Sequence, residues 1–219
     1  MLGSLAVGGP LGAKTNDLGI EFVQLPGSEI WMSKYETRRE EFAKFVAETE
    51  YDATQGMFSL RADAFDWAPN GDTWFSPGYP QTDDHPVVGV SLEDARAFCA
   101  WLNERETETL NGLIYRLPSD LEWSLAIGLE DAASDTPELR MKNGPGLYPW
   151  GDSWPPPKDF GNYAGTESAQ DKPSWWGTIP GGYTDAFPRT APVGTFPPNE
   201  LGLYDLSGNV WEWVDSTFT

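Results

Sequence analysis

The chain has 219 residues, with 34 acidic and 14 basic side chains, so its formal net charge is −20. This charge repels phosphate groups, which argues against binding to nucleic acids and to anionic membrane surfaces. Hydrophobic residues make up 39% of the chain and include 11 Trp and 11 Phe, enough for a sizeable core. No run of about 18 apolar residues occurs, so we expect no membrane span.

The chain contains one cysteine, Cys99, and one histidine, His85. A single thiol excludes an internal disulfide and a zinc site built on several cysteines, and a single imidazole excludes a multi-histidine site. The start of the chain, "MLGSLAVGGPLGAKTN", lacks a basic region and is broken by Gly and Pro, so it is a poor signal peptide and slightly favours the cytoplasm. We interpret residues 1–16 as a linker or disordered start and residues 17–219 as one domain.

The first elements in chain order are a hairpin and a helix. The stretch "GIEFVQLPGSEIWMSKY" alternates around a Pro-Gly turn and predicts strands at Ile20–Leu25 and Glu29–Tyr35. The next stretch, "TRREEFAKFVAETE", has a one-sided apolar stripe and predicts an amphipathic helix. Thr37 and Glu40 have the spacing of a capping box at its start.

Two further helices are predicted from their caps. Ser91 precedes apolar residues at helical spacing, and Cys99 lies on that stripe, where it is expected to be a buried and unreactive thiol. Ser119 precedes the third helix, with Glu122 three residues on and Gly128 at its end. Residues 129–200 are rich in Gly, Pro, Trp and Asp and favour ordered loops held by buried rings.

Four ordered motifs then resemble the formylglycine-generating enzyme family, also called the sulfatase-modifying-factor family. They are "HPVVGVSLEDARAFCAWL" (85–102), "YRLPSDLEWSLAIG" (115–128), "YPWGDSWP" (148–155) and "TAPVGTFPPNELGLYDLSGNVWEW" (190–213). The resemblance covers roughly residues 20–213 and implies an irregular, loop-rich α+β fold of the C-type-lectin-like kind. Departures are Leu92, where the family has Trp, and "LPSDLEW" in place of LPTEAEW.

The end of the chain is the largest departure from the family pattern. In the family, GNVWEW is followed by a further segment with several arginines, which in the oxidases carries a copper-binding cysteine pair. This sequence ends at Thr219. We therefore expect that copper is not bound by this chain, and that a second chain or copy completes the fold or the core has been repacked.

The resemblance also implies two calcium sites, since calcium takes carboxylate, amide and backbone carbonyl oxygens as ligands. One site would use the side chains of Asn162 and Asp185 with the carbonyls of Tyr163 and Phe187. The other would use the side chains of Asp205 and Glu212 with the carbonyls of Gly208 and Val210. The alternative interpretation is that these acids only cap turns. Trp211 and Trp213 are expected to be core residues.

These observations favour a non-catalytic, calcium-stabilised, lectin-like binding or scaffold module that binds a glycan or a protein. Aromatic rings in loops are candidate ligand contacts, although packing is the alternative role for each of them: Trp67, Trp74, Trp175 and Trp176. The second hypothesis is a formylglycine-generating oxidase, which converts a sulfatase cysteine to formylglycine, with its catalytic cysteines beyond this chain. One thiol and one histidine make catalysis by this chain the less favoured interpretation.

Overall fold

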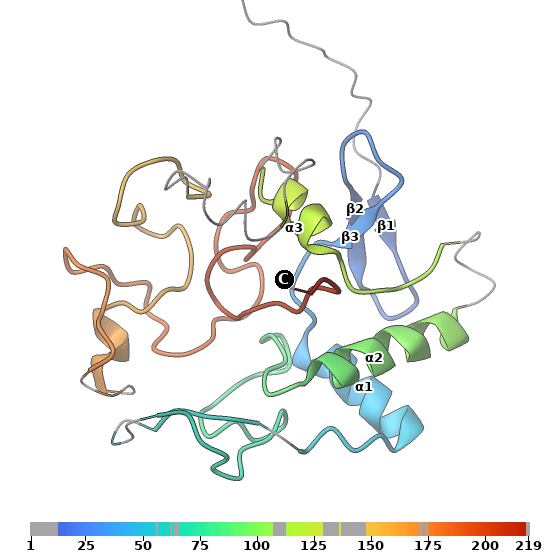
Figure 1. Ribbon diagram of the computed structural model, residues 1–219, viewed down its shortest axis with the longest axis horizontal. Coiled ribbons are helices and arrows are strands. Elements are labelled where there is room, and N and C mark those ends of the chain that lie inside the picture. Colours follow the sequence, from blue (N-terminus) through green and yellow to red (C-terminus); the bar gives the residue numbers. More distant parts are fainter. Residues whose placement is uncertain are drawn as a thin grey trace, which may run out of the picture.

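The computed structural model describes residues 13–55, 57–61, 63, 66–106, 113–128, 136, 148–170, 173 and 175–217. Three short strands form one antiparallel sheet in the order β1 (Ala13–Thr15), β2 (Glu21–Gln24) and β3 (Trp31–Ser33). The α-helices are α1 (Arg39–Thr49), α2 (Leu92–Arg105) and α3 (Asp120–Ala126), and a 3₁₀ helix, η2, spans Thr166–Gln170. The rest of the described chain is mainly turns and loops, so the architecture is loop-rich and mixed α/β (Figure 1).

The hairpin lies where the alternating pattern predicts it. In β2 and β3, Phe22 pairs with Ser33 and Gln24 with Trp31. The predicted linker is corrected at its C-terminal end, because residues 13–15 pair with β2 as β1. The Asn16 side chain accepts the backbone N–H groups of Leu18 and Ile20 and thereby holds the turn between β1 and β2. Residues 1–12 lie outside the described residues.

The helix starts follow local capping chemistry, with one shift in register. Ser91 and Ser119 are N-caps, and each hydroxyl accepts a backbone N–H three residues on. The predicted cap at Thr37 is wrong by one residue, since α1 has Arg38 as its N-cap and Glu41 accepts the Arg38 N–H at 2.7 Å. The reason is that the Thr37 carbonyl accepts the N–H of Val87, which keeps Thr37 outside the helix.

The main hydrophobic core lies between α1 and α2, which run beside each other below the sheet in Figure 1. Phe42 and Phe45 of α1 contact Phe98 of α2, with ring centroids 5.9 and 5.8 Å apart. Burying a ring of this size stabilises the fold by about 2–3 kcal/mol. A smaller cluster joins Leu25, Ala126 and Leu203, and so attaches α3 and the C-terminal loop to the hairpin.

The C-terminal segment, red in Figure 1, runs through the middle of the molecule between the sheet, α2 and α3. Within the described residues, no helix is long and apolar enough to cross a membrane. This central path of residues 203–217 places the predicted calcium-binding loop next to elements from both ends of the chain.

Candidate functional site

The first predicted cation site is a set of loops around Asp185. One oxygen of this carboxylate accepts the Tyr163 N–H at 2.7 Å, and the other accepts the Phe187 N–H at 2.9 Å. The Asn162 side chain is buried, and its amide nitrogen donates to the Arg189 carbonyl at 2.6 Å. The structure thus brings Asn162, Tyr163, Asp185 and Phe187 together, while their role as cation ligands stays a prediction.

The second predicted site is the loop from Asp205 to Glu212. Asp205 and Gly208 have positive φ angles of 57° and 95°, which produce the tight turn. Asp205 accepts the Gly194 N–H at 2.7 Å, and Glu212 accepts the indole N–H of Trp123 at 2.5 Å. Burial raises the pKa of Asp205. Glu212 is exposed at the cleft as a residue, but the atoms packed around its carboxyl raise its pKa to about 7, with a further contribution from the charge of Asp205.

Glu36 is a third acid at the second site, and no sequence motif indicates it. It is 7% exposed, and its carboxylate accepts bonds from the Asn209 amide at 2.7 Å and the Val210 N–H at 3.3 Å. Burial raises the pKa of Glu36 well above its usual range, and the charges of Asp205 and Glu212 raise it further. Its only sequence signal is an acid placed directly between a predicted strand and a predicted helix.

Glu167 is an acid at the first site that sequence reasoning also missed. Both of its carboxylate oxygens are buried, and neither accepts a hydrogen bond from the described residues. It lies within hydrogen-bonding reach of Asp185, whose pKa is raised first by burial and then by this neighbouring acid. Its only sequence signal was its position five residues after Asn162, in a loop that otherwise reads as irregular.

The two predicted sites are interlocked through Asn209. Its side-chain oxygen accepts the Asn162 amide at 3.0 Å, and its backbone N–H donates to the Asn162 carbonyl at 2.9 Å. The hydroxyl groups of Tyr163 and Ser207 form a further hydrogen bond at 2.8 Å. A Cβ added at Gly208 would lie 2.5 Å from the Asn162 carbonyl oxygen, so the two loops are in close contact.

The prediction that these loops hold a cation can be compared with the oxygen atoms that they offer. In the described part of the chain, no group of three or more His, Cys, Asp or Glu side chains has metal-binding geometry. A cation here would therefore take amide and carbonyl oxygens in addition to carboxylates, which is the ligand set that calcium prefers. The buried, unpartnered oxygens of Glu167 are the observation that fits such an ion best.

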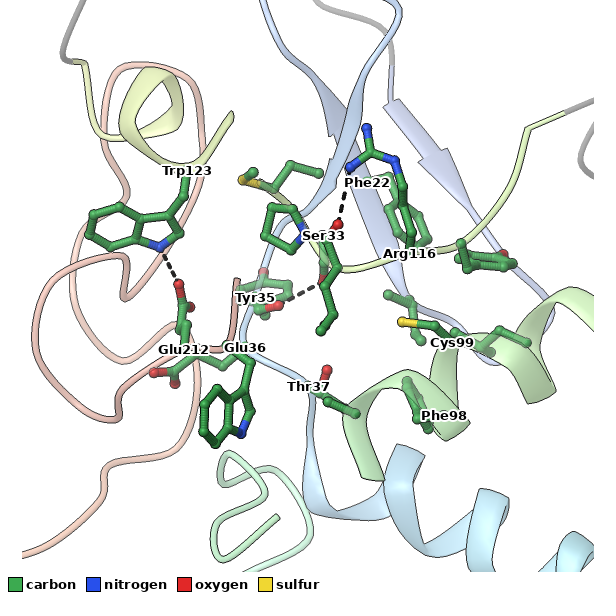
Figure 2. A pocket seen from close by; sticks show the side chains of 18 of the residues that line it. Phe22, Ser33, Tyr35, Glu36, Thr37, Phe98, Cys99, Arg116, Trp123 and Glu212 are labelled. Carbon is green, nitrogen blue, oxygen red and sulfur yellow. Dashed lines mark hydrogen bonds between the residues drawn. The ribbon is translucent and has the colours of Figure 1, made fainter. Parts of the chain in front are cut away.

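A cleft of about 500 Å³ adjoins the second site. Figure 2 shows Glu36 and Glu212 beside each other at one end, with Trp123 bonded to Glu212 and Cys99 on the wall formed by α2. Burial raises the pKa of the Cys99 thiol to about 11, as expected for an unreactive cysteine. Apolar side chains such as Phe22 and Phe98 line much of the cleft, together with four acids, which are Glu29, Glu36, Glu122 and Glu212.

Two predictions for tryptophans of the chain are wrong. Trp211 and Trp213 were expected in the core, but Trp211 is 98% exposed and Trp213 is 47% exposed. Both line the cleft, and the Trp213 indole N–H donates to the Val90 carbonyl instead of packing in the interior. Trp74 was a candidate ligand contact, but it is 7% exposed because it packs edge-on against Phe42 in the core.

The other three candidate tryptophans form one surface cluster. Trp67 contacts Trp176 with ring centroids 5.8 Å apart, although the two residues are far apart in sequence. Trp175 and Trp176 are stacked at 6.4 Å. All three rings are exposed, with Trp175 the most open at 54%. The structure thus brings Trp67, Trp175 and Trp176 together, while their role in ligand binding stays a prediction.

Comparisons with known proteins identify relatives over most of the chain. The profile of the "Sulfatase-modifying factor enzyme 1-like domain" matches residues 5–219. Formylglycine-generating enzyme from Mus musculus is 31% identical over 218 residues, covering 86% of this chain and 49% of that protein. "Inactive C-alpha-formylglycine-generating enzyme 2" from Bos taurus is 34% identical over 203 residues, covering 84% of this chain and 54% of that protein. The chain thus spans about half the length of these curated relatives.

Solved structures agree on the fold. PvdO from Pseudomonas aeruginosa superposes with a TM-score of 0.60 at 20% identity, covering 97% of this chain and 77% of PvdO. CarF superposes with a TM-score of 0.50 at 22% identity and the same coverages. At these identities the likeness concerns the fold alone. On the profile match across residues 5–219, the chain belongs to the sulfatase-modifying factor family, which includes the formylglycine-generating enzymes.

Proposed function

We propose that this part of the protein is a non-catalytic, calcium-stabilised binding or scaffold domain with a C-type-lectin-like arrangement of its loops. The observation that carries the proposal is the contact between the two acidic loops through Asn209 and Asn162. Carboxylates gathered in a buried setting are costly unless an ion or a donor neutralises them. Bound calcium would stabilise the ionised forms of Asp185 and Asp205 and would fix the loops that surround them.

Calorimetric titration with calcium, after removal of bound ions with a chelator, tests this proposal. We expect heat of binding and a rise in melting temperature for the wild type, and a smaller response for Asp205→Ala. Glu93→Gln, which removes one charge from an exposed position on α2, is the control and should respond like the wild type. Absence of both heat and thermal shift in the wild type would contradict calcium stabilisation.

The surface cluster of Trp67, Trp175 and Trp176 supports a binding role. Exposed aromatic faces of this kind pack against sugar rings or peptide side chains. A glycan array and a pull-down would separate the two ligand classes, and Trp176→Ala should lose the ligand. Trp154→Ala is the matched control, because that ring is also half exposed but contacts Tyr148 and Trp150 instead. Equal binding by both variants would contradict a role of the cluster in ligand binding.

The cleft supports a second element of the proposal, which is that another chain or copy covers it. Trp211 and Trp213 line this cleft, and both rings are exposed to solvent, as apolar side chains at interaction sites are. Light scattering tests this directly. A second chain or copy predicts a dimer or a complex that Trp211→Ser disrupts, whereas a monomer that melts cooperatively would contradict it.

The alternative function is a formylglycine-generating oxidase whose catalytic cysteines lie outside this chain. The name of the Mus musculus relative favours it, while the name of the Bos taurus relative describes an inactive protein. Cys99 does not supply such chemistry, since its raised pKa leaves little thiolate at neutral pH and Cu(I) prefers thiolate ligands. Turnover of a cysteine-containing sulfatase peptide by this chain, with copper and oxygen, would overturn the non-catalytic assignment.

A further inference from the structure

The carboxylate of Glu167 is confined by the backbone around it. Glu167 lies in η2, and a Cβ added at Gly165 would meet its two oxygens at 2.3 and 2.7 Å. The same added atom would lie 2.8 Å from the Tyr183 carbonyl oxygen, so the carboxylate and this carbonyl approach the same point of the backbone. Glu167 therefore points inward at this loop, beside another oxygen and away from solvent.

No donor neutralises this carboxylate in the described part of the chain. Both of its oxygens are buried without a hydrogen-bond partner, although a carboxylate ordinarily accepts several bonds. The nearby backbone N–H groups of Tyr163 and Phe187 are used by Asp185. Thr166, next to Glu167, donates its N–H to the Tyr183 carbonyl. A buried acceptor left in this state is destabilising unless a group outside the polypeptide satisfies it.

Asp185 places a second buried carboxyl beside Glu167. It is 7% exposed, and its carboxyl lies within hydrogen-bonding reach of the Glu167 carboxyl. Neither acid forms an ion pair with a basic side chain among the described residues. Two adjacent buried carboxylates without a counter-charge repel each other. A shared cation between them removes the repulsion and satisfies the unpartnered oxygens at once.

Asn162 is a neutral residue next to this pair of acids, and it carries an amide oxygen. Its amide nitrogen donates to the Arg189 carbonyl and to Asn209, which fixes the orientation of the amide. Asn162 is buried, and the N–H of the next residue, Tyr163, donates to Asp185, so Asn162 lies beside that carboxylate. An amide oxygen is one of the ligand types that calcium takes in proteins.

We propose that Glu167 is a ligand of a divalent cation, which it shares with Asp185 and Asn162. This inference rests on the proposed calcium stabilisation and deepens it, because it adds a second carboxylate to a site for which the sequence predicted one. The number of charged ligands is a main determinant of calcium affinity. The first site should therefore bind calcium more tightly than a site with Asp185 alone, and Glu167 should set that affinity.

The proposal predicts that the effect of Glu167→Gln on stability differs with and without calcium. Without calcium, removing one of two repelling carboxylates should raise the melting temperature above that of the wild type. With saturating calcium, the melting temperature of the variant should rise by less than that of the wild type, because the site has lost one negative charge. A carboxylate with a purely structural role would change stability by the same amount in both conditions.

Thermal unfolding in chelator and in calcium, together with calcium calorimetry on the full chain, tests the inference. We expect the affinity of one site to fall at least tenfold in Glu167→Gln, while Glu93→Gln, the exposed control, keeps wild-type values. Glu167→Asp keeps the charge on a shorter side chain and should weaken binding severalfold, and it replaces the Gln variant if that variant does not fold.

The outcomes separate this inference from the proposed function. If the wild type shows no calcium response, calcium stabilisation and the role of Glu167 both fail. If the wild type responds and both Glu167 variants bind with unchanged affinity, only the role of Glu167 is overturned. A tenfold loss in the Gln variant with higher stability in chelator supports it.

Discussion

Replacing Asn209 by alanine is the sharpest test of the interlocked loops. The Asn209 side chain donates to Glu36 at 2.7 Å and to the Ala191 carbonyl at 3.2 Å. It accepts the Ala191 N–H at 2.8 Å and the Asn162 amide at 3.0 Å. One residue therefore connects three segments that lie far apart in the sequence, and its loss should affect both candidate cation sites together.

The magnitude follows from these contacts. A hydrogen bond in a protein contributes about 1 kcal/mol net, so the four side-chain bonds amount to about 4 kcal/mol. Asn209 also has a φ angle of 54°, a left-handed conformation that costs alanine about 1 kcal/mol more than asparagine. We expect Asn209→Ala to lower the free energy of unfolding by about 5 kcal/mol and Asn209→Gly by about 4 kcal/mol, since glycine adopts this conformation without strain.

Urea and thermal unfolding, followed by tryptophan fluorescence and circular dichroism, measure these values. For a chain of this length, each kcal/mol corresponds to about 2–4 °C in melting temperature, so Asn209→Ala should melt about 10–20 °C lower. The glycine variant separates the lost bonds from the backbone strain. A loss below about 1 kcal/mol in both variants would refute the reasoning that Asn209 connects the loops.

Three further predictions concern other parts of the fold. Cys99 should react slowly with a thiol reagent at pH 8 and show a midpoint near its raised pKa of about 11; a midpoint near pH 8.5 would contradict its buried placement. Hydrogen bonding to Arg116 lowers the pKa of Glu122 to about 2, so its stabilisation is present above its ordinary pKa of 4.5 and is lost as the pH falls from there to about 2. Glu122→Gln should therefore cost about 1–2 kcal/mol at pH 7, after allowance for solvent screening, and almost nothing at pH 2, as measured by chemical unfolding. Gly208→Ala should cost at least about 3 kcal/mol, because its Cβ would lie 2.5 Å from a backbone carbonyl oxygen. Gly202→Ala has a similar positive φ with open space around it and should cost only about 1 kcal/mol, so equal losses in the two variants would contradict the close contact.

The parts of the fold that sequence predicted are those that depend on neighbours in the chain. Ser91 and Ser119 cap their helices because each hydroxyl reaches a backbone N–H three residues away, a distance that the sequence fully specifies. The hairpin followed in the same way from alternation and a Pro-Gly turn. The predicted cap of α1 is one residue too early because the Thr37 carbonyl accepts the N–H of the distant Val87, and the extended N-cap is Arg38.

The candidate site was predictable only as far as the family resemblance reached. Asp185 and Asp205 are named from motifs, and the structure places Asp185 in a buried position and Asp205 in a half-buried one, each with a backbone donor. Glu36 and Glu167 were not named, because no local pattern shows that these acids turn inward. The bond from Asn209 to Glu36 spans 173 positions, and such pairings arise only from the tertiary fold. The exposure of Trp211 could not be predicted for the same reason, because the local sequence does not show whether an aromatic side chain faces the core or the solvent.

The interlocking of the loops has a thermodynamic consequence for the proposed cation sites. Asn162 belongs to the first site, but its amide and carbonyl bond to Asn209 in the loop of the second. If both sites bind an ion as proposed, an ion that orders one loop would also order part of the other, and the second ion would meet a site whose entropy cost is already reduced. Such coupling would be reciprocal, so each ion would raise the affinity for the other by the same factor. The two loops would then respond to ions as one unit, and the hydrogen bonds from Asn209 to Glu36 and from Trp123 to Glu212 would connect that unit to its surroundings.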